Sequence, residues 1–220
     1  MLPVVEVRRH LPHAPWTYSS LDSYQRQIAA QLLRGAGAGR VLISEVAPVI
    51  TLGRRACSED VLVSEEQLSS MGISLFSTDR GGRATYHGPG QWVVFVVDRL
   101  ESMTGDRRGV RRAVEGLLGV AKAVGLQLLS SEVHVRQGAE AGVWTPKGKL
   151  ASVGVQVQDG VMLHGMALNV YRTAESFRGL RPCGLDAQPD FLLGAPDEKR
   201  FLEIPEMISQ ELGRHFWIQG

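Results

Sequence analysis

The stretch GVWTPKGKLASVGVQVQDGVMLHGMALNV, residues 142–170, decides the fold because it predicts a long β-hairpin. Alternating residues flank Asp159-Gly160, a dipeptide typical of two-residue hairpin turns. Such a turn fixes the register of the two strands. The pairs that follow from it are Gln158 with Val161, Gln156 with Leu163, Gly154 with Gly165, and Ser152 with Ala167.

Paired residues share a face of a sheet, so one face of this hairpin carries four small residues together. They are Ser152, Gly154, Gly165 and Ala167. Small residues inside a strand often mark the close approach of a ligand or of another backbone. Two interpretations stay open: a shallow slot for a slim aliphatic group, or a helix packed tightly against the small residues. The opposite face is core-like, with Val153, Val155, Val157, Met162, Met166 and Leu168.

Lys149 and Cys183 are the candidate catalytic residues of this region. Lys149 begins the first hairpin strand, and Cys183 stands in the turn Arg181-Pro182-Cys183-Gly184. A nearby ammonium group favours the charged form of a thiol, so the pair suggests thiolate chemistry. The alternatives are a solvated lysine at a strand end and a small core cysteine. Cys57 is interpreted as structural or incidental.

The side chain of Lys149 poses a geometric difficulty. Strict alternation along the strand places it on the Val153 face, away from the small residues. If Lys149 acts with Cys183, the turn at Pro146–Gly148 or a bulge after it must redirect the side chain.

A glycine-rich loop, DRGGRATYHGPGQ, spans residues 79–91. Loops of this kind can bind anions through backbone N–H groups. It lacks the Gly-Lys-Ser/Thr ending of a phosphate-binding loop, and no GxGxxG opens a helix here. His87 has three interpretations: an acid/base group, an anchor for the loop, or a satisfied, semi-buried histidine. No Cys/His grouping has the spacing of a zinc site, so no metal is expected.

The chain as a whole has the size and composition of one globular domain over residues 1–220. It has 220 residues, a formal net charge of +1 and 44% hydrophobic residues. The near-neutral charge argues against nucleic-acid binding, and no apolar run is long enough for a membrane span. The N-terminus resembles neither a secretory signal nor a transit peptide, so the two cysteines are expected to be free thiols in the cytoplasm, with a disulfide between them as the alternative.

Strands and helices alternate irregularly along the predicted chain. The expected strands are 4–8, 41–45, 49–52, 73–77, 92–97, 126–129, 133–135 and the hairpin. The expected helices are 24–33, a short one after Ser64, 110–124 ending at Gly125, and one starting near Pro205. We therefore expect an α/β (α+β) fold with a mixed sheet flanked by helices, in which the apolar run at 92–97 is a central strand.

Several motifs together resemble the lipoyl(octanoyl) transferase family, over roughly Ile43 to Cys183. Their order and spacing are specific, although each alone is weak. They are Thr51-Leu52-Gly53-Arg54, the loop from Asp79 to Gln91, Gly142-Val143-Trp144, Gly148 to Gly154, His164 to Asn169, and Pro182-Cys183-Gly184.

The resemblance implies a fold akin to the catalytic domain of biotin and lipoate protein ligases. It implies that Cys183 forms an acyl-thioester intermediate and that Lys149 lowers the pKa of that cysteine. It also implies substrate contacts by three stretches. These are Arg80, Gly81, Gly82, Arg83, Ala84, Thr85, Tyr86 and His87; Ser152, Val153 and Gly154; and Gly165, Met166 and Ala167.

The activity implied is transfer of an octanoyl group from octanoyl-acyl carrier protein to a lysine of a lipoyl domain. The acceptors would be 2-oxoacid dehydrogenase E2 subunits and the glycine cleavage H protein. Transfer from a thioester to an amide is downhill, so no ATP, metal or other cofactor is expected. The alternatives are an ATP-dependent lipoate or biotin ligase and an inactive lipoyl-domain binding protein.

Acyl carrier proteins are acidic, so exposed arginines are candidates for docking, with a solvated basic face as the alternative. The candidates are Arg54, Arg55, Arg107, Arg108, Arg111 and Arg112.

Overall fold

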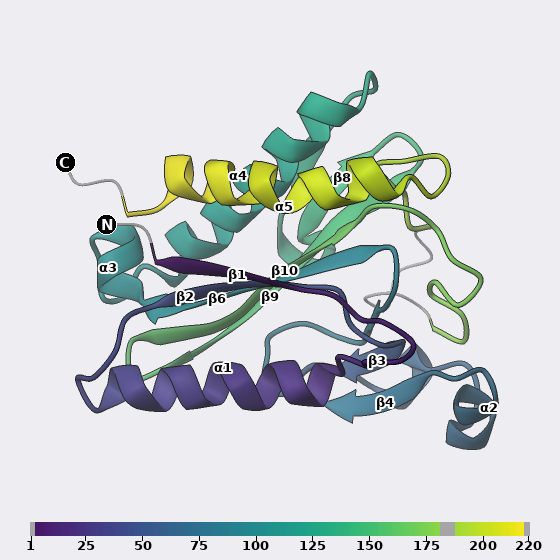
Figure 1. Ribbon diagram of the computed structural model, residues 1–220, viewed down its shortest axis with the longest axis horizontal. Helices are drawn as coiled ribbons and strands as arrows, with labels where there is room; N and C mark the ends of the chain where they lie inside the picture. Colours follow the sequence, from purple (N-terminus) through teal and green to yellow (C-terminus); the bar gives the residue numbers. More distant parts are fainter. Residues whose placement is uncertain (1–2, 181–187, 218–220) are drawn as a thin grey trace.

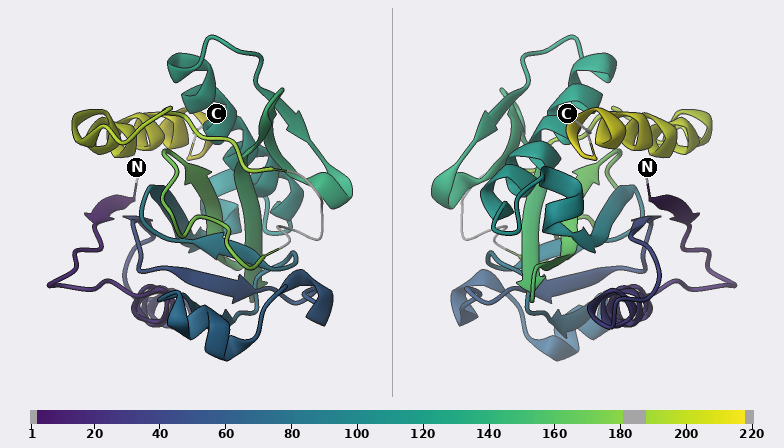
Figure 2. Two further views of the ribbon diagram at one scale, coloured as in Figure 1. Left: turned by 90° about the vertical axis from the view of Figure 1, so that its right-hand side faces the viewer. Right: turned by 90° about the vertical axis from the view of Figure 1, so that its left-hand side faces the viewer.

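The computed structural model describes residues 3–180 and 188–217, apart from the side chain of Ala139. A seven-stranded sheet with the order β1-β2-β6-β10-β9-β8-β7 runs through its middle, and a three-stranded sheet has the order β4-β3-β5. The helices α4 and α5 cover one face of the large sheet, and α1 covers the other (Figure 1). The side views in Figure 2 show the same layers, with α2 on the α1 side.

The elements have the following bounds. The large sheet comprises β1 (Val4–Arg8), β2 (Arg40–Ser44), β6 (Gln91–Arg99), β7 (His134–Arg136), β8 (Gly142–Thr145), β9 (Gly148–Gln158) and β10 (Val161–Asn169). The small sheet comprises β3 (Val49–Leu52), β4 (Ser74–Ser77) and β5 (Thr85–His87). The helices are α1 (Tyr18–Leu33), α2 (Glu65–Ser70), α3 (Leu100–Thr104), α4 (Val110–Leu128) and α5 (Glu198–His215).

The sheet is mixed, as the sequence predicts. β1 pairs with β2 in parallel at one edge, whereas the other pairs of the large sheet are antiparallel. β6 is a central strand, and residues 92–97 are all buried. Trp92, Val94 and Val96 face α4 and α5, while Val93, Phe95 and Val97 face α1. Because neither face of β6 is exposed to solvent, neither face needs polar side chains, which explains the continuous apolar run.

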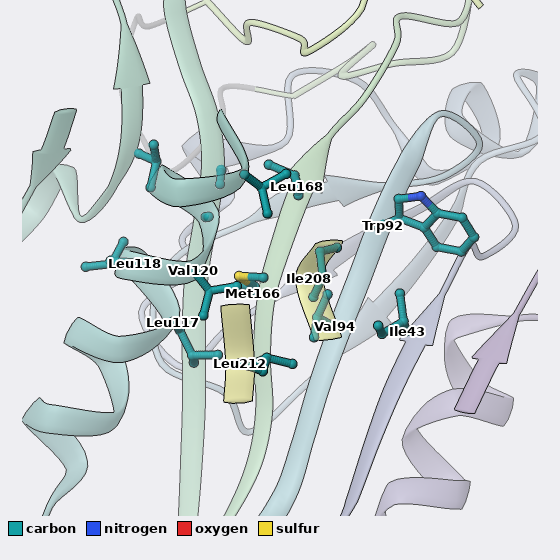
Figure 3. Packing of buried hydrophobic residues seen from close by; sticks show 14 of the residues in the cluster. Ile43, Trp92, Val94, Leu117, Leu118, Val120, Met166, Leu168, Ile208 and Leu212 are labelled. Atoms are coloured by element: carbon teal, nitrogen blue, oxygen red, sulfur yellow. The ribbon is translucent and has the colours of Figure 1, made fainter. Parts of the chain in front are cut away.

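The predicted hairpin is confirmed together with its register. β9 and β10 pair Gln158 with Val161, Gly154 with Gly165 and Ser152 with Ala167. The predicted core face packs into the cluster formed with α4 and α5, where Met166 and Leu168 meet side chains from both helices (Figure 3). The hairpin therefore separates this core from the α1 side of the sheet.

The prediction that α4 ends at Gly125, followed by a strand at 126–129, is wrong. The helix continues to Leu128, and the N–H of Leu129 donates to the carbonyl of Gly125 at 2.9 Å. Glycine weakens a helix interior by about 1 kcal/mol but does not end it. Its role here is packing, because a Cβ at Gly125 would lie 3.1 Å from Leu150 and 3.2 Å from Val133.

Pro205 does not begin the last helix, contrary to expectation. α5 starts at Glu198, where the side chain of Asp197 caps it by accepting from the N–H of Arg200 at 3.1 Å. Proline inside a helix leaves the carbonyl four residues earlier without its usual donor. The indole N–H of Trp92 donates to that carbonyl, on Phe201, at 3.1 Å. A tertiary contact from Trp92 thus supplies the hydrogen bond to the Phe201 carbonyl that Pro205 cannot donate.

α1 also starts earlier than the predicted Tyr24. The side chain of Thr17 caps it by accepting from the N–H of Ser20 at 3.1 Å. The extra turn brings Tyr18 and Leu21 into the core beneath the sheet.

Candidate active site

A cavity of about 420 Å³ lies on the α1 side of the large sheet. The glycine-rich loop forms one wall, and the strands β6, β9 and β10 form another. The lining residues are Tyr18, Arg55, Arg80, Gly82, Arg83, Thr85, His87, Val93, Phe95, Gly138, Ala141, Lys149, Ser152, Val153, Gly154, His164, Gly165, Met166 and Ala167. All four small residues of the hairpin face are among them.

A β-bulge places Lys149 in this cavity. The β8–β9 register pairs Val143 with Ala151 but Trp144 with Lys149, so β9 carries one extra residue between the two pairs. Leu150 and Ala151 consequently both pack into the α4–α5 core. The bulge reverses the alternation, so that Lys149 faces the cavity with Ser152. This is the redirection of the Lys149 side chain that the sequence requires if Lys149 is to face the small residues.

Gly142 on β8 leaves the space that the Lys149 side chain occupies. A Cβ at residue 142 would collide with the Lys149 Cε and would lie 3.2 Å from its Nζ and 2.6 Å from the Ala151 carbonyl. Lys149 is only 7% exposed, and its Nζ lies 5.4 Å from the centre of the Trp144 ring. An ammonium over an indole gains a cation–π interaction. The lysine is therefore held by packing rather than extended into solvent.

The backbone of Lys149 is fastened to the segment that follows residue 187. Its N–H donates to the carbonyl of Gln188 at 2.9 Å, and its carbonyl accepts from the N–H of Asp190 at 2.9 Å. The side-chain amide of Asn169 donates to the carbonyls of both Lys149 and Asp190, each at 3.1 Å. Asn169 thus joins the strand of Lys149 to the return segment.

The same amide network continues to His87. Gln91 donates to the Asn169 side-chain oxygen at 2.8 Å, and its own oxygen lies 2.6 Å from the His87 Nδ1. The His87 ring also stacks on Tyr18, with ring centres 5.4 Å apart. Burial, with a contribution from the charge of Arg80, lowers the pKa of His87 to about 3. A neutral, hydrogen-bonded ring favours the anchor and satisfied-histidine interpretations over an acid/base role at neutral pH.

Arg80 ties the glycine-rich loop together. Its guanidinium donates to the carbonyls of Gly81 at 3.1 Å, Arg83 at 2.9 Å and Thr51 at 2.8 Å. The buried guanidinium also lines the cavity. It contributes to lowering the pKa of both His87 and His164.

The backbone of the loop lies against the hairpin. The N–H of Gly81 donates to the carbonyl of Val155 at 2.9 Å. A Cβ at Gly154 would lie 2.8 Å from the Gly81 carbonyl, and one at Gly165 would collide with the carbonyl of Val94. The small residues thus border a cavity, a loop and a neighbouring strand, and no helix of the described residues shows the tight packing on them that the sequence left open.

Most of the predicted site residues come together in the cavity. Gly81, Ala84 and Tyr86 do not line it, and Tyr86 packs beside the small sheet with its ring 5.4 Å from Phe177. Cys183 lies outside the described residues. Cys57 is exposed and does not line the cavity, and its sulfur accepts from Arg83 at 2.8 Å.

The cavity residues that sequence reasoning missed are Tyr18, Val93, Phe95, Gly138, Ala141 and His164. The early start of α1 brings in Tyr18. His164 belongs to the motif His164 to Asn169, but its backbone φ of 62° breaks the alternation of β10, which no sequence pattern signals. Phe95 could have been found, because its pairing with Gly165 extends the small-residue face onto β6.

The predicted arginine patch is split in space. Arg55, just after β3, lines the cavity. Arg111 and Arg112 begin α4, which starts next to α3 at the end of the molecule opposite β3 (Figure 1). The six arginines therefore do not form one surface.

Residues 3–180 and 188–217 contain neither a grouped set of metal ligands nor a membrane-spanning helix. No three histidine, cysteine, aspartate or glutamate side chains of this part group as metal ligands would. No helix in it combines the length and apolar character needed to cross a membrane.

Comparison with known proteins gives consistent matches. Residues 21–188 match the family model described as the lipoyl protein ligase A/B catalytic domain. An octanoyltransferase from Alkaliphilus metalliredigens is 36% identical over 171 residues, covering 76% of this chain and 75% of the relative. One from Chloroflexus aurantiacus is 36% identical over 211 residues, covering 92% and 91%.

Among solved structures, a bipartite lipoate protein ligase with its E2 lipoyl domain, from Thermoplasma acidophilum, aligns with a TM-score of 0.54 and 18% identity. The alignment covers 96% of this chain and 82% of that one. At this identity the match concerns the fold alone. It confirms the predicted similarity to lipoate protein ligase catalytic domains.

Proposed function

Because this chain belongs to the lipoyl protein ligase A/B catalytic-domain family, we propose that it is an octanoyltransferase that works through a thioester on Cys183. Octanoyl transfer in protein lipoylation is the activity of its named relatives, and residues 1–220 would act as one catalytic domain. The observation that carries the mechanism is the β-bulge. It turns Lys149 into a cavity that small residues border.

In the first half-reaction, the thiolate of Cys183 attacks the carbonyl carbon of the octanoyl thioester on an acyl carrier protein. A bond forms between the Cys183 sulfur and that carbon, and the bond from the carbon to the carrier sulfur breaks. The carrier thiolate leaves and takes up a proton. The Lys149 ammonium stabilises the attacking thiolate.

In the second half-reaction, the ε-amine of a lipoyl-domain lysine attacks the same carbon. The new carbon–nitrogen bond is an amide, the carbon–sulfur bond breaks, and the proton lost from the amine returns to the Cys183–Lys149 pair. Backbone N–H groups near the Gly81–Gly82 loop are candidates to hold the oxyanion in both steps. A thiolate mechanism suits the reducing cytoplasm, where we place the reaction.

The described flanks of Cys183 support its approach to Lys149. On one side, Gly179 accepts from the N–H of Leu62 at 2.8 Å, beside the small sheet. On the other, Gln188 is hydrogen-bonded to Lys149 itself. Gln188 follows Cys183 by five residues in the sequence, and five residues of an extended chain span at most about 18 Å.

The carrier and acceptor partners belong to this proposal. The Thermoplasma ligase was solved with an E2 lipoyl domain, which supports lipoyl domains as acceptors here. We propose E2 subunits of 2-oxoacid dehydrogenases and the glycine cleavage H protein as acceptors. Of the six arginines, the exposed Arg55 is the one that lines the cavity, so we propose it as a contact for the acidic carrier protein.

The test is transfer of octanoate from octanoyl-acyl carrier protein to an apo-lipoyl domain, followed by mass spectrometry of the acceptor. We expect transfer without ATP, and its loss in Cys183→Ala but not in Cys57→Ala. Strict dependence on ATP would instead support a lipoate or biotin ligase. Full function in Cys183→Ala would support a lipoyl-domain binding protein.

A further inference from the structure

His164 faces the cavity although its position in β10 predicts the opposite face. Met162 and Met166, two residues before and after it on the strand, pack against the α4–α5 core. His164 has a backbone φ of 62°, which is uncommon for a residue other than glycine. This left-handed backbone conformation directs the His164 ring toward α1. Such backbone strain persists where the surroundings hold it, and it is frequent at ligand sites.

Three side chains hold the His164 ring in place. Gln25 accepts from the His164 backbone N–H at 2.8 Å, and its amide nitrogen lies 3.2 Å from Nδ1. The Tyr18 hydroxyl lies 3.3 Å from Nδ1, and the ring meets Phe95 edge-on with centres 5.0 Å apart. His164 is 0% exposed. Behind it, Gln25 is bonded to Asp22 of the same helix at 2.7 Å, so α1 closes this end of the cavity.

The His164 and Tyr18 rings of this wall are uncharged, so they can border a hydrocarbon chain, and the Asp22 carboxylate lies 3.9 Å from the His164 Nε2. Burial, with a contribution from Arg80, lowers the pKa of His164 to about 3. Burial also raises the pKa of Tyr18, which keeps its hydroxyl protonated. The hydrogen-bonding atoms of the two rings are turned toward each other and toward Gln25. A chain end that pushed past them would leave those groups unsatisfied.

The register gives the distance from the lysine to this wall. The Lys149 amine lies beside Gly142, which pairs with Ser152, and Ser152 pairs with Ala167. His164 is three residues along β10 from Ala167. Three residues of a strand span about 10 Å along β10, and the two strand spacings from β8 to β10 add about 10 Å across the sheet, so Gly142 and His164 lie roughly 14 Å apart. Seven carbon–carbon bonds in a zigzag span about 9 Å, and van der Waals contact of the methyl end with the ring adds about 4 Å.

We propose that His164, held by Tyr18 and Gln25, is the specificity-determining residue that limits the acyl group to about eight carbons. This inference rests on the proposed function, since it concerns the acyl chain that Cys183 receives. The carbonyl end would lie near Lys149, the chain would pass over Gly154 and Gly165, and the methyl end would meet the His164 ring.

The test compares octanoyl, decanoyl and dodecanoyl thioesters of the carrier in transfer to a lipoyl domain. The principal variant is His164→Gly, because glycine adopts a positive φ without strain and removes the ring. His164→Asn is the second variant, since asparagine also tolerates this conformation and is shorter. Asp159→Gly is the matched control: it has a φ of 48° in the same hairpin but sits in the exposed turn.

We expect the wild type to lose rate steeply beyond eight carbons. In His164→Gly the ratio of decanoyl to octanoyl transfer should rise at least tenfold, because room for two methylenes is gained. His164→Asn should shift the ratio in the same direction by less, and Asp159→Gly should match the wild type.

Three results would overturn the inference. They are a flat chain-length profile in the wild type, an unchanged ratio in folded His164 variants, and an equal loss of transfer for every chain length. Failure of the proposed function would look different, because the wild type would then form no thioester on Cys183 with any acyl group.

Discussion

Replacing Gly142 with alanine should displace the Lys149 ammonium while leaving both predicted catalytic residues in the sequence. The new Cβ would collide with the Lys149 Cε and would lie 2.6 Å from the Ala151 carbonyl. The Lys149 side chain is flexible and can give way, whereas the Ala151 carbonyl belongs to the backbone of β9, so the pairing of β8 with β9 must also shift. Overpacking of this kind costs about 1–3 kcal/mol.

The size of the kinetic effect follows from that range. If the strain appears as loss of the placed ammonium, the acyl-enzyme should form about 5- to 150-fold more slowly, at 1.36 kcal/mol per factor of ten. The pH at which Cys183 is half alkylated by iodoacetamide should move upward, because the cation that favours the thiolate has moved away. Single-turnover mass spectrometry measures the first quantity, and an alkylation rate profile measures the second.

Two comparisons make this prediction refutable. Gly194→Ala is the control, since a Cβ there meets nothing within 4 Å and the residue is exposed. In a Lys149→Ala background, Gly142→Ala should add less slowing, because only the contact with the Ala151 carbonyl then remains. A Gly142→Ala protein with the rate and alkylation profile of the wild type would refute the placement of Lys149. So would an equal slowing in the presence and absence of Lys149.

Two further predictions concern Asn169 and the buried histidines. Asn169→Ala should slow acyl-enzyme formation by about tenfold and raise the pH midpoint of Cys183 alkylation, whereas Gln127→Ala, which breaks an amide contact to Glu211, should leave that midpoint unchanged. His87 and His164 have folded pKa values near 3, below the ordinary 6.5, so the unfolded chain binds more protons in acid. Stability should thus be full above pH 6.5 and fall toward pH 3, by up to about 2.7 kcal/mol per pH unit; a urea-unfolding free energy that is flat from pH 7 to 4.5 contradicts this.

The hairpin could be predicted from the sequence because its determinants are local. Asp159-Gly160 sets the turn, the turn sets the register, and the register sets which residues share a face. Every pair predicted in this way is found. The central strand at 92–97 could also be predicted, because a continuous apolar run is typical of a strand that is buried on both faces.

The errors occurred where a tertiary contact outweighs a local signal. Pro205 reads as a helix start, but the indole of Trp92 on β6 satisfies the carbonyl that the proline leaves open. Gly125 reads as a helix stop, but it provides the space in which α4 packs on Leu150. Neither partner is near in sequence, so neither effect could be foreseen.

Only the part of the candidate site that depends on local sequence could be predicted. The small residues and Lys149 are on the hairpin, and sequence reasoning identified both, together with the need for a bulge at Lys149. Tyr18 and His164 are 146 residues apart and meet only through folding. The left-handed backbone at His164 leaves no trace in the pattern of apolar residues.

The most direct measurement of the central claim is the intact mass of the protein after mixing with octanoyl-acyl carrier protein alone. We expect one octanoyl adduct, removed by hydroxylamine, and peptide mapping should place it on Cys183. Cys183→Ser should give no hydroxylamine-labile adduct, and Lys149→Ala should form the adduct slowly. An absent adduct in the wild type, or one carried by Cys57, would contradict the proposed mechanism.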